Sequence, residues 1–265
     1  MNLLALDTAT ERLALALAAG ERSATVDAEG GAAASAQLIP QLLALLAEHG
    51  LRVCDLDAIA FGRGPGAFTG LRTAVSVAQG LAFGAGKPVL AIDSLLIVAD
   101  DARAQWLAAQ PGRAGQAFTV WVAMDARMEQ VYAAAYRHGG DEDAAGPAWQ
   151  VSCEPALYDL PTLHARWAAE PPGQVAGSAL AAFGEALQAG PAQRWPRQHD
   201  RAAALLRLSR AAWQAGATLP AEQALPLYLR DKVALTTAER AAQRRGPVEP
   251  QPAPAAARPA AQGAV

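Results

Sequence analysis

The sequence predicts an α/β protein made of two similar lobes. Residues 3–17 (LLALDTATERLALAL) have the pattern of a strand, an aspartate, three residues, a glutamate and a returning strand, and residues 120–136 (VWVAMDARMEQVYAAAY) repeat it. Helical apolar patterns follow strand patterns in both halves, and 52% of the 265 residues are hydrophobic, enough for a sizeable core. A duplicated fold with a cleft between its lobes explains the repeat, and coincidence between two unrelated hairpins is the alternative.

The first half begins with strand patterns at residues 3–7, 13–18 and 24–29. A helix is expected from Ser35 to His49, because apolar residues recur at helical spacing and Gly50 follows as a stop signal. Pro40 is expected in the first turn of this helix, since proline deeper in a helix breaks it.

A strand at residues 57–62 leads into a glycine-rich loop. We expect a helix over residues 69–85 with Thr69 as its N-cap. A strand at 89–93 and a helix capped by Ser94 complete a first lobe at residues 1–110, before Pro111 and Gly112.

The second half predicts strands at 118–124, 131–136 and 174–177, and an exposed loop at 138–147. Helices are expected from Leu180 and over residues 202–215, giving a second lobe at residues 111–216. A C-terminal segment, residues 217–239, is expected to pack back on the lobes. The tail, residues 240–265, is rich in proline and alanine and is expected to be disordered.

Charge and composition limit the classes of function. The net charge is −3 and the pI about 5.8, so the chain lacks the excess of basic residues typical of a protein that binds nucleic acid alone. The start of the chain has no basic n-region, and no apolar stretch has the length of a membrane span. We therefore expect a cytoplasmic protein that does not bind membranes and contacts RNA only through a partner.

The glycine-rich loop FGRGPGAFTG (61–70) is the most distinctive motif. Its candidate residues are Gly62, Arg63, Gly64, Pro65, Gly66, Thr69 and Gly70. The spacing of a P-loop is absent, so the loop is a weak signal for phosphate binding. The helix that follows is rich in small residues, including Gly80 and Gly84, which indicates close packing either inside the molecule or against a partner.

Candidate catalytic residues are sparse. Asp7 and Asp125 end equivalent predicted strands, where paired carboxylates could hold a metal–phosphate group, or each could simply cap its own turn. The four histidines are scattered, there is no Gly-x-Ser-x-Gly elbow, and no motif indicates a metal site. This pattern favours recognition over catalysis.

Four stretches resemble the TsaB (YeaZ) family, which takes part in making threonylcarbamoyladenosine in bacterial tRNA. They are LALDTATERLALAL, AFGRGPGAFTGLRTAVSVAQGLAFG, MDARMEQVYAAAY and LPLYLRDKVA, and the similarity runs from Met1 to about Val233. The resemblance implies a two-lobed fold of the actin, Hsp70 and sugar-kinase type, a duplicated RNase H-like fold (ASKHA). It also implies a non-catalytic partner of a catalytic paralogue, TsaD, that is joined by an ATPase, TsaE, and that also forms homodimers.

The TsaD paralogue carries a His-x-x-x-His metal motif after its glycine-loop helix, and residues 89–101 of this chain contain no histidine. The resemblance therefore favours the partner subunit, with no metal and no cofactor of its own; a nucleotide at the interface of the complex is left open. It implies an interface on the first two helices, with the contacts Leu38, Leu42, Leu45, Arg72, Val75 and Gln79. The alternative is an ATP-binding phosphotransferase or ATPase of the same fold, with the nucleotide held by Asp7, Asp125 and Gly177.

Overall fold

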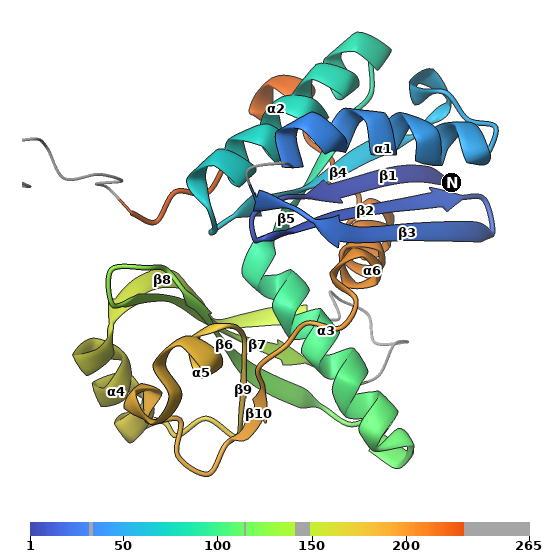
Figure 1. Ribbon diagram of the computed structural model, residues 1–265. Helices are drawn as coiled ribbons and strands as arrows, with labels where there is room; N and C mark the ends of the chain where they lie inside the picture. The colour runs from blue at the N-terminus through green and yellow to red at the C-terminus, as the bar shows by residue number, and fades with distance from the viewer. Residues whose placement is uncertain (32–33, 114, 141–148, 231–265) are drawn as a thin grey trace, which may run out of the picture. The chain divides into compact units, whose positions relative to one another are not determined.

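Two five-stranded sheets with the same topology form the framework of the protein (Figure 1). The computed structural model describes residues 1–31, 34–113, 115–140 and 149–230. The first sheet has the order β3-β2-β1-β4-β5, with strands β1 (Asn2–Asp7), β2 (Arg12–Ala19), β3 (Arg22–Glu29), β4 (Ala58–Gly64) and β5 (Val89–Asp93). The second has the order β8-β7-β6-β9-β10, with strands β6 (Phe118–Asp125), β7 (Gln130–His138), β8 (Trp149–Asp159), β9 (Gln174–Ala176) and β10 (Gln193–Trp195).

The pairing of the strands confirms the predicted duplication. In each sheet the first three strands form an antiparallel meander, and the last two add in parallel to the first strand's free edge. The helices follow the same order in both halves: α1 (Ala34–Glu48), α2 (Phe68–Ala85) and α3 (Ser94–Ala109), then α4 (Leu160–Ala169), α5 (Ala179–Phe183) and α6 (Arg201–Gln214).

The last helix of each half packs on the sheet of the other half. Buried residues of α3, among them Val98 and Trp106, pack with Phe118 and Val122 of the second sheet. Buried residues of α6, such as Leu205, pack on the strands of the first sheet. Because of this exchange, both sheets belong to one compact unit, residues 1–230.

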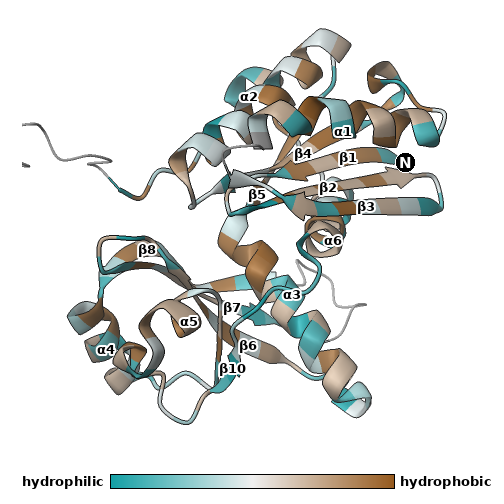
Figure 2. Ribbon diagram, viewed as in Figure 1, coloured by the Kyte–Doolittle hydropathy of each residue, from teal (hydrophilic) through white to brown (hydrophobic). Residues whose placement is uncertain are grey.

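The other face of the first sheet is covered by α1 and α2, so its central strands are buried on both faces. Leu4 and Leu6 of β1 pack in the cluster that includes α1 and α2, whereas Leu3 and Ala5 pack in the cluster that includes α6. This explains the continuous apolar run of β1, which is typical of a strand between two helical layers. Figure 2 shows the hydrophobic colouring along β1 and β2.

Three expected helix boundaries were wrong. Pro40 lies inside α1, beyond its first turn. The helix tolerates it because the neighbouring leucines on its inner face are fully buried. The N-cap of α2 is Ala67 rather than Thr69, and the N-cap of α3 is Asp93 rather than Ser94.

Some sequence predictions fall outside the described residues: most of the predicted loop at 138–147, residues 231–239 of the C-terminal segment, and the tail at 240–265. His138 itself is the last residue of β7. Among the described residues, no helix has the length and hydrophobicity needed to cross a membrane.

Candidate functional site

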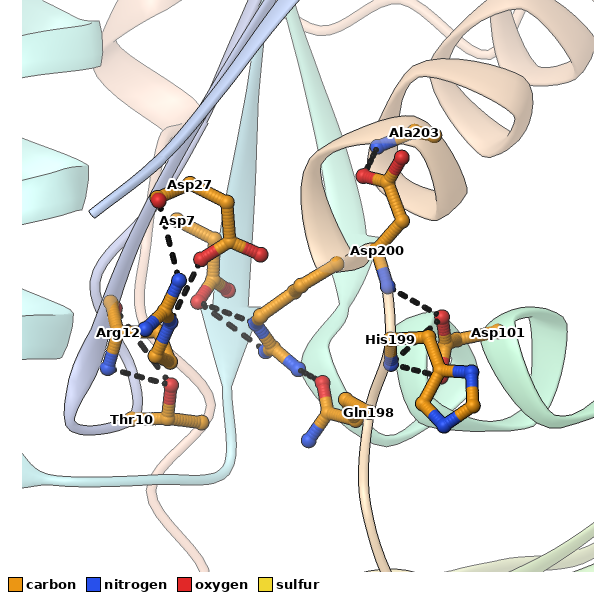
Figure 3. Close-up of polar contacts among 10 residues, drawn as sticks. Asp7, Thr10, Arg12, Asp27, Asp101, Gln198, His199, Asp200 and Ala203 are labelled. Carbon is orange, nitrogen blue, oxygen red and sulfur yellow. Dashed lines mark hydrogen bonds and ion pairs between the residues drawn. The ribbon is translucent and has the colours of Figure 1, made fainter. Parts of the chain in front are cut away.

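Asp7, at the end of β1, is buried and its charge is already paired. It is 0% exposed, and Arg201 at the start of α6 forms an ion pair with it, with Nε and Nη2 both 3.1 Å from Asp7 Oδ1 (Figure 3). The Ala9 amide donates to the same oxygen at 2.9 Å, and the Ser94 hydroxyl donates to Oδ2 at 2.9 Å. The carboxylate therefore has a partner on each oxygen.

The loop before α6 sets the position of Arg201. Asp101 of α3 accepts hydrogen bonds from the backbone amides of His199, at 3.0 Å, and Asp200, at 2.8 Å (Figure 3). Asp200 then caps α6 by accepting from the Ala203 amide at 2.8 Å. Gln198 Oε1 accepts from Arg201 Nη1 at 2.6 Å. Because α6 packs on the first sheet, Arg201 lies next to Asp7, although the two residues are 194 positions apart in the sequence.

The glycine-rich loop packs on the turn that follows Asp7. A Cβ on Gly62 would lie 1.6 Å from Asp7 Oδ2, and one on Gly70 would lie 1.8 Å from the Thr8 carbonyl oxygen. Thr8 Oγ1 also donates to the Gly70 carbonyl at 2.7 Å. Side chains at these two positions would collide with the chain's own backbone and carboxylate, so the loop is bare because it lies directly against β1 and the turn after it.

Arg63 and Gly64 of the loop contact the end of β5 and the start of α3. Arg63 forms an ion pair with Asp93 at the end of β5. Gly64 donates its amide to Ser94 Oγ at 3.1 Å, so Ser94 bridges the loop and Asp7. Pro65 is buried, Gly66 is half-buried and Thr69 is exposed.

Asp125 and Gly177 have local structural contacts of their own. Asp125 Oδ1 accepts from the Arg127 amide at 2.8 Å, so it caps the turn between β6 and β7. Gly177 has a φ of 117°, and a Cβ there would lie 2.3 Å from the Ala123 carbonyl oxygen, so glycine is needed for packing against β6. Among the described residues, no group of three or more His, Cys, Asp or Glu side chains is placed to hold a metal ion.

Four of the six residues expected to contact a partner are buried within the chain itself. Their side chains lie in the core, with exposed fractions of 6% or less: Leu38, Leu42, Leu45 and Val75. They occupy the faces of α1 and α2 that pack on the first sheet. The helical repeat explains the difference, because the apolar stripe that identified the helices is the stripe that turns inward.

Arg72 and Gln79 of α2 lie outside this core. The Arg72 guanidinium stacks 3.9 Å from the centre of the Phe68 ring and donates from Nε to the Tyr228 hydroxyl at 3.1 Å. Gln79 is half-buried and donates to the Ala221 carbonyl at 3.1 Å, which ties α2 to the chain's C-terminal part.

The outer sides of α1 and α2 carry exposed apolar and small residues together with one arginine. We call this surface the α1–α2 face: Ile39, Leu43, Arg72, Ser76, Gly80, Phe83 and Gly84. Phe83 is 78% exposed, and Ile39 and Leu43 are each nearly half exposed. A Cβ on Gly80 or Gly84 would meet no atom of the described residues within 4 Å. Packing among the described residues therefore does not explain these two glycines.

A shallow groove of about 480 Å³ lies along this face. Ser35 of α1 lines it together with residues of the first half of α2: Phe68, Thr69, Arg72, Thr73, Ser76 and Val77. The groove combines hydroxyl groups, a guanidinium and an aromatic ring, so it offers hydrogen bonds and apolar area together.

Sequence reasoning did not identify Arg201 or Arg230 as site residues. Nothing near Arg201 in the sequence signals its ion pair, because the partner is 194 positions away. Arg230 lies within the motif LPLYLRDKVA and contacts the β6–β7 turn.

Comparisons with known proteins match this chain to proteins described as TsaD and as TsaB. A family model described as TsaD, tRNA N6-adenosine threonylcarbamoyltransferase, matches residues 28–194. The tRNA threonylcarbamoyladenosine biosynthesis protein TsaB of Haemophilus influenzae is 39% identical over 132 residues, which are 50% of this chain and 52% of that protein. The Escherichia coli protein of the same name is 31% identical over 247 residues, covering 88% of this chain and 96% of that protein.

A solved structure shows the same fold. YeaZ from Pseudomonas aeruginosa superimposes with a TM-score of 0.70 at 34% sequence identity, covering 86% of this chain and 99% of that one. The relatives matched over nearly their whole length are thus TsaB and YeaZ proteins, although the matching family model is named for the transferase. The chain belongs to the TsaB (YeaZ) family.

Proposed function

We propose that this chain is a non-catalytic subunit of the machinery that forms threonylcarbamoyladenosine in tRNA, and that it binds a TsaD-like transferase through the α1–α2 face. A TsaE-like ATPase is the further partner of this complex. Family membership supports the pathway, since the relatives in H. influenzae and E. coli are named for threonylcarbamoyladenosine biosynthesis.

The observation that carries the proposal is the open side of α2. Glycine within a helix costs about 1 kcal/mol relative to alanine. Within the part of the chain that the structure describes, Gly80 and Gly84 have no neighbour that would exclude a Cβ, so packing among these residues gains nothing from them. A second protein packed on the α1–α2 face would gain from them, because small residues let two backbones approach closely.

The state of Asp7 supports a non-catalytic role. A carboxylate that binds Mg²⁺ must direct free oxygens at the ion. Both oxygens of Asp7 instead face Arg201, Ser94 and a backbone amide, and the side chain is wholly buried. This arrangement counts against the alternative of an ATP-binding phosphotransferase.

The same face serves for self-association in this proposal. A homodimer and the complex with the transferase would then exclude each other. Contact with tRNA is assigned to the complex as a whole, since the chain has a net charge of −3.

The test is reconstitution of tRNA modification with the purified TsaD-like and TsaE-like proteins of the same organism. We expect modification to require this chain and to fall at least tenfold with Phe83→Glu. The matched control is Val151→Glu, which places the same charge at a 46% exposed apolar position of β8. Full modification without the chain, or full support by the Phe83 variant, would refute the proposal.

A further inference from the structure

The segment Leu225–Arg230, which we call the C-terminal strap, runs from the glycine-rich loop to the β6–β7 turn. Its first anchor is on the loop and α2. The Leu227 amide donates to the Arg63 carbonyl at 2.7 Å. The Tyr228 ring lies 5.5 Å from the Phe68 ring, and its hydroxyl accepts from Arg72 at 3.1 Å.

The second anchor of the strap is Arg230, on the turn between β6 and β7. Its Nη2 donates to the Ala126 carbonyl at 2.9 Å, and its Nη1 lies 2.9 Å from Met128 Sδ. A weaker contact joins Nη2 to the Arg127 carbonyl at 3.4 Å. One guanidinium therefore contacts three successive residues of the turn.

The turn that Arg230 contacts has an unfavourable backbone. Arg127, Met128 and Glu129 have φ values of 62°, 53° and 58°, and none of them is glycine. Residues other than glycine rarely adopt this left-handed backbone conformation. They keep it only where surrounding contacts impose it. All three side chains are exposed, so few core contacts are available to hold them.

We propose that the strap is a mechanical link, in which the seat of Tyr228 on Phe68 and Arg72 keeps Arg230 in place and Arg230 holds the β6–β7 turn in its left-handed form. Arg230 is then a positioning residue for the turn. A molecule that displaces Tyr228 from the side of α2 frees the turn as well. The link depends only on contacts within the chain, so it stands whether or not the α1–α2 face binds a transferase.

The test is hydrogen exchange of the full chain, followed at the turn. Three turn amides are hydrogen-bonded and report on it: Ala126, Arg127 and Gln130. We expect Arg230→Met to speed exchange at these amides about tenfold, and Tyr228→Ala to speed it by a smaller but measurable factor. Arg194→Met, which removes an exposed arginine paired with Glu185, is the matched control and should leave the turn unchanged.

Amides in the middle of β6 and β7 separate a local effect from general destabilisation. Faster exchange at the turn with unchanged exchange in these strands supports the link. Unchanged turn exchange in Arg230→Met would overturn it, and so would a change equal to that of the strands. Faster exchange in Arg230→Met with none in Tyr228→Ala would also overturn it, because the strap would then transmit nothing.

Discussion

At the scale of single residues, the ion pair of Asp7 and Arg201 has the largest consequences. Two charges taken out of water are costly, and their attraction repays this cost only with good geometry and further hydrogen bonds. Here Ser94, Ala9 and Gln198 supply those bonds. The pair joins β1 to α6. The same contact therefore neutralises the Asp7 carboxylate and holds α6 on the first sheet.

Removing Arg201 should destabilise the fold strongly. In Arg201→Met the buried Asp7 charge loses its cation, and breaking such a pair from one side typically costs about 3–5 kcal/mol. Urea denaturation at pH 7 measures this loss. Arg194→Met is the control, and should cost about 0.5 kcal/mol or less, because Glu185 is 93% exposed. Equal losses for the two variants would show that the buried pair has no special weight.

His138 makes stability depend on pH. It is 4% exposed, and burial, helped by the nearby Arg103, lowers the pKa of His138 from 6.5 to about 4. Between these values the unfolded chain takes up a proton that the folded chain does not. Stability that is fully present above pH 6.5 is therefore lost as the pH falls toward 4, by at most about 3 kcal/mol.

Urea denaturation at pH 7 and pH 4.5, for the wild type and His138→Gln, isolates this contribution. Asp100, next to the same Trp149 side chain, titrates too: burial raises the pKa of Asp100 against the pull of Arg207. Its contribution is common to both proteins, so the difference between them belongs to His138. A variant whose stability follows the wild-type pH dependence would contradict the assignment.

Residue identity alone predicted little of the site. Asp7 and the glycine-rich loop were found, because a bare loop after a buried strand is a local signal. The contact between the loop and Asp7 was not predicted. In sequence, a glycine needed because a side chain would overlap a carboxylate looks the same as a glycine needed for phosphate binding. Sequence alone could not place Arg201 either, because its partner is joined to it only by the exchange of α3 and α6.

At the scale of elements, α2 has two faces with different purposes. Its inner face, with Ala74, Val75 and Ala78, is buried on the first sheet. Its outer face carries Gly80 and Gly84, where an added Cβ would meet none of the described residues. A charge at Val75 would therefore enter the core and destabilise the chain, whereas a charge on the outer face should weaken association without entering the core.

Gly80→Ala should separate stability from association. No described residue lies within 4 Å of the new methyl group, so the helix should gain about 0.5–1 kcal/mol. The same methyl group projects from the α1–α2 face. It should weaken binding of a partner, because the two backbones can no longer approach as closely. Denaturation of the dilute chain and a binding titration measure the two effects.

The control for this prediction is Gly62→Ala, which should lose stability because its methyl group overlaps Asp7. If Gly80→Ala bound the partner as tightly as the wild type, α2 would not be the contact. If it were less stable than the wild type, its outer side would be packed in a way the structure does not show.

Element prediction failed where patterns were interrupted. The strand β8 was not predicted because Glu154 and Pro155 break its alternating pattern. At this point the register with β7 shifts, between Ala133 and Ala135. The proline therefore lies at an irregularity of an edge strand. The strand β10 is only three residues long. The helix α4 had a readable signal, since Asp159 caps it and Pro161 lies in its first turn.

At the scale of the whole molecule, the duplicated topology was predictable because the repeated strand–aspartate–turn–strand pattern is local in each half. The exchange of α3 and α6 was not, since helical patterns do not say which sheet a helix covers. In our proposal this exchange matters for function, because it brings Arg201 to Asp7, which the phosphotransferase alternative would need for its nucleotide.

The chain should therefore not bind ATP with Mg²⁺. The reason is that Asp7 is buried and its oxygens are occupied, while Asp125 and Gly177 serve the packing around the β6–β7 turn and β9. Isothermal titration calorimetry of the isolated chain should show no heat of binding above dilution. Saturable binding that disappears with Asp125→Asn would instead favour the phosphotransferase alternative.

The most direct test of the central claim is size-exclusion chromatography with light scattering, on this chain mixed with the TsaD-like protein of its own organism. We predict a stoichiometric complex for the wild type and for Val151→Glu. For Phe83→Glu we predict two separate folded proteins. A complex that forms equally well with Phe83→Glu would contradict the claim that the α1–α2 face binds the transferase.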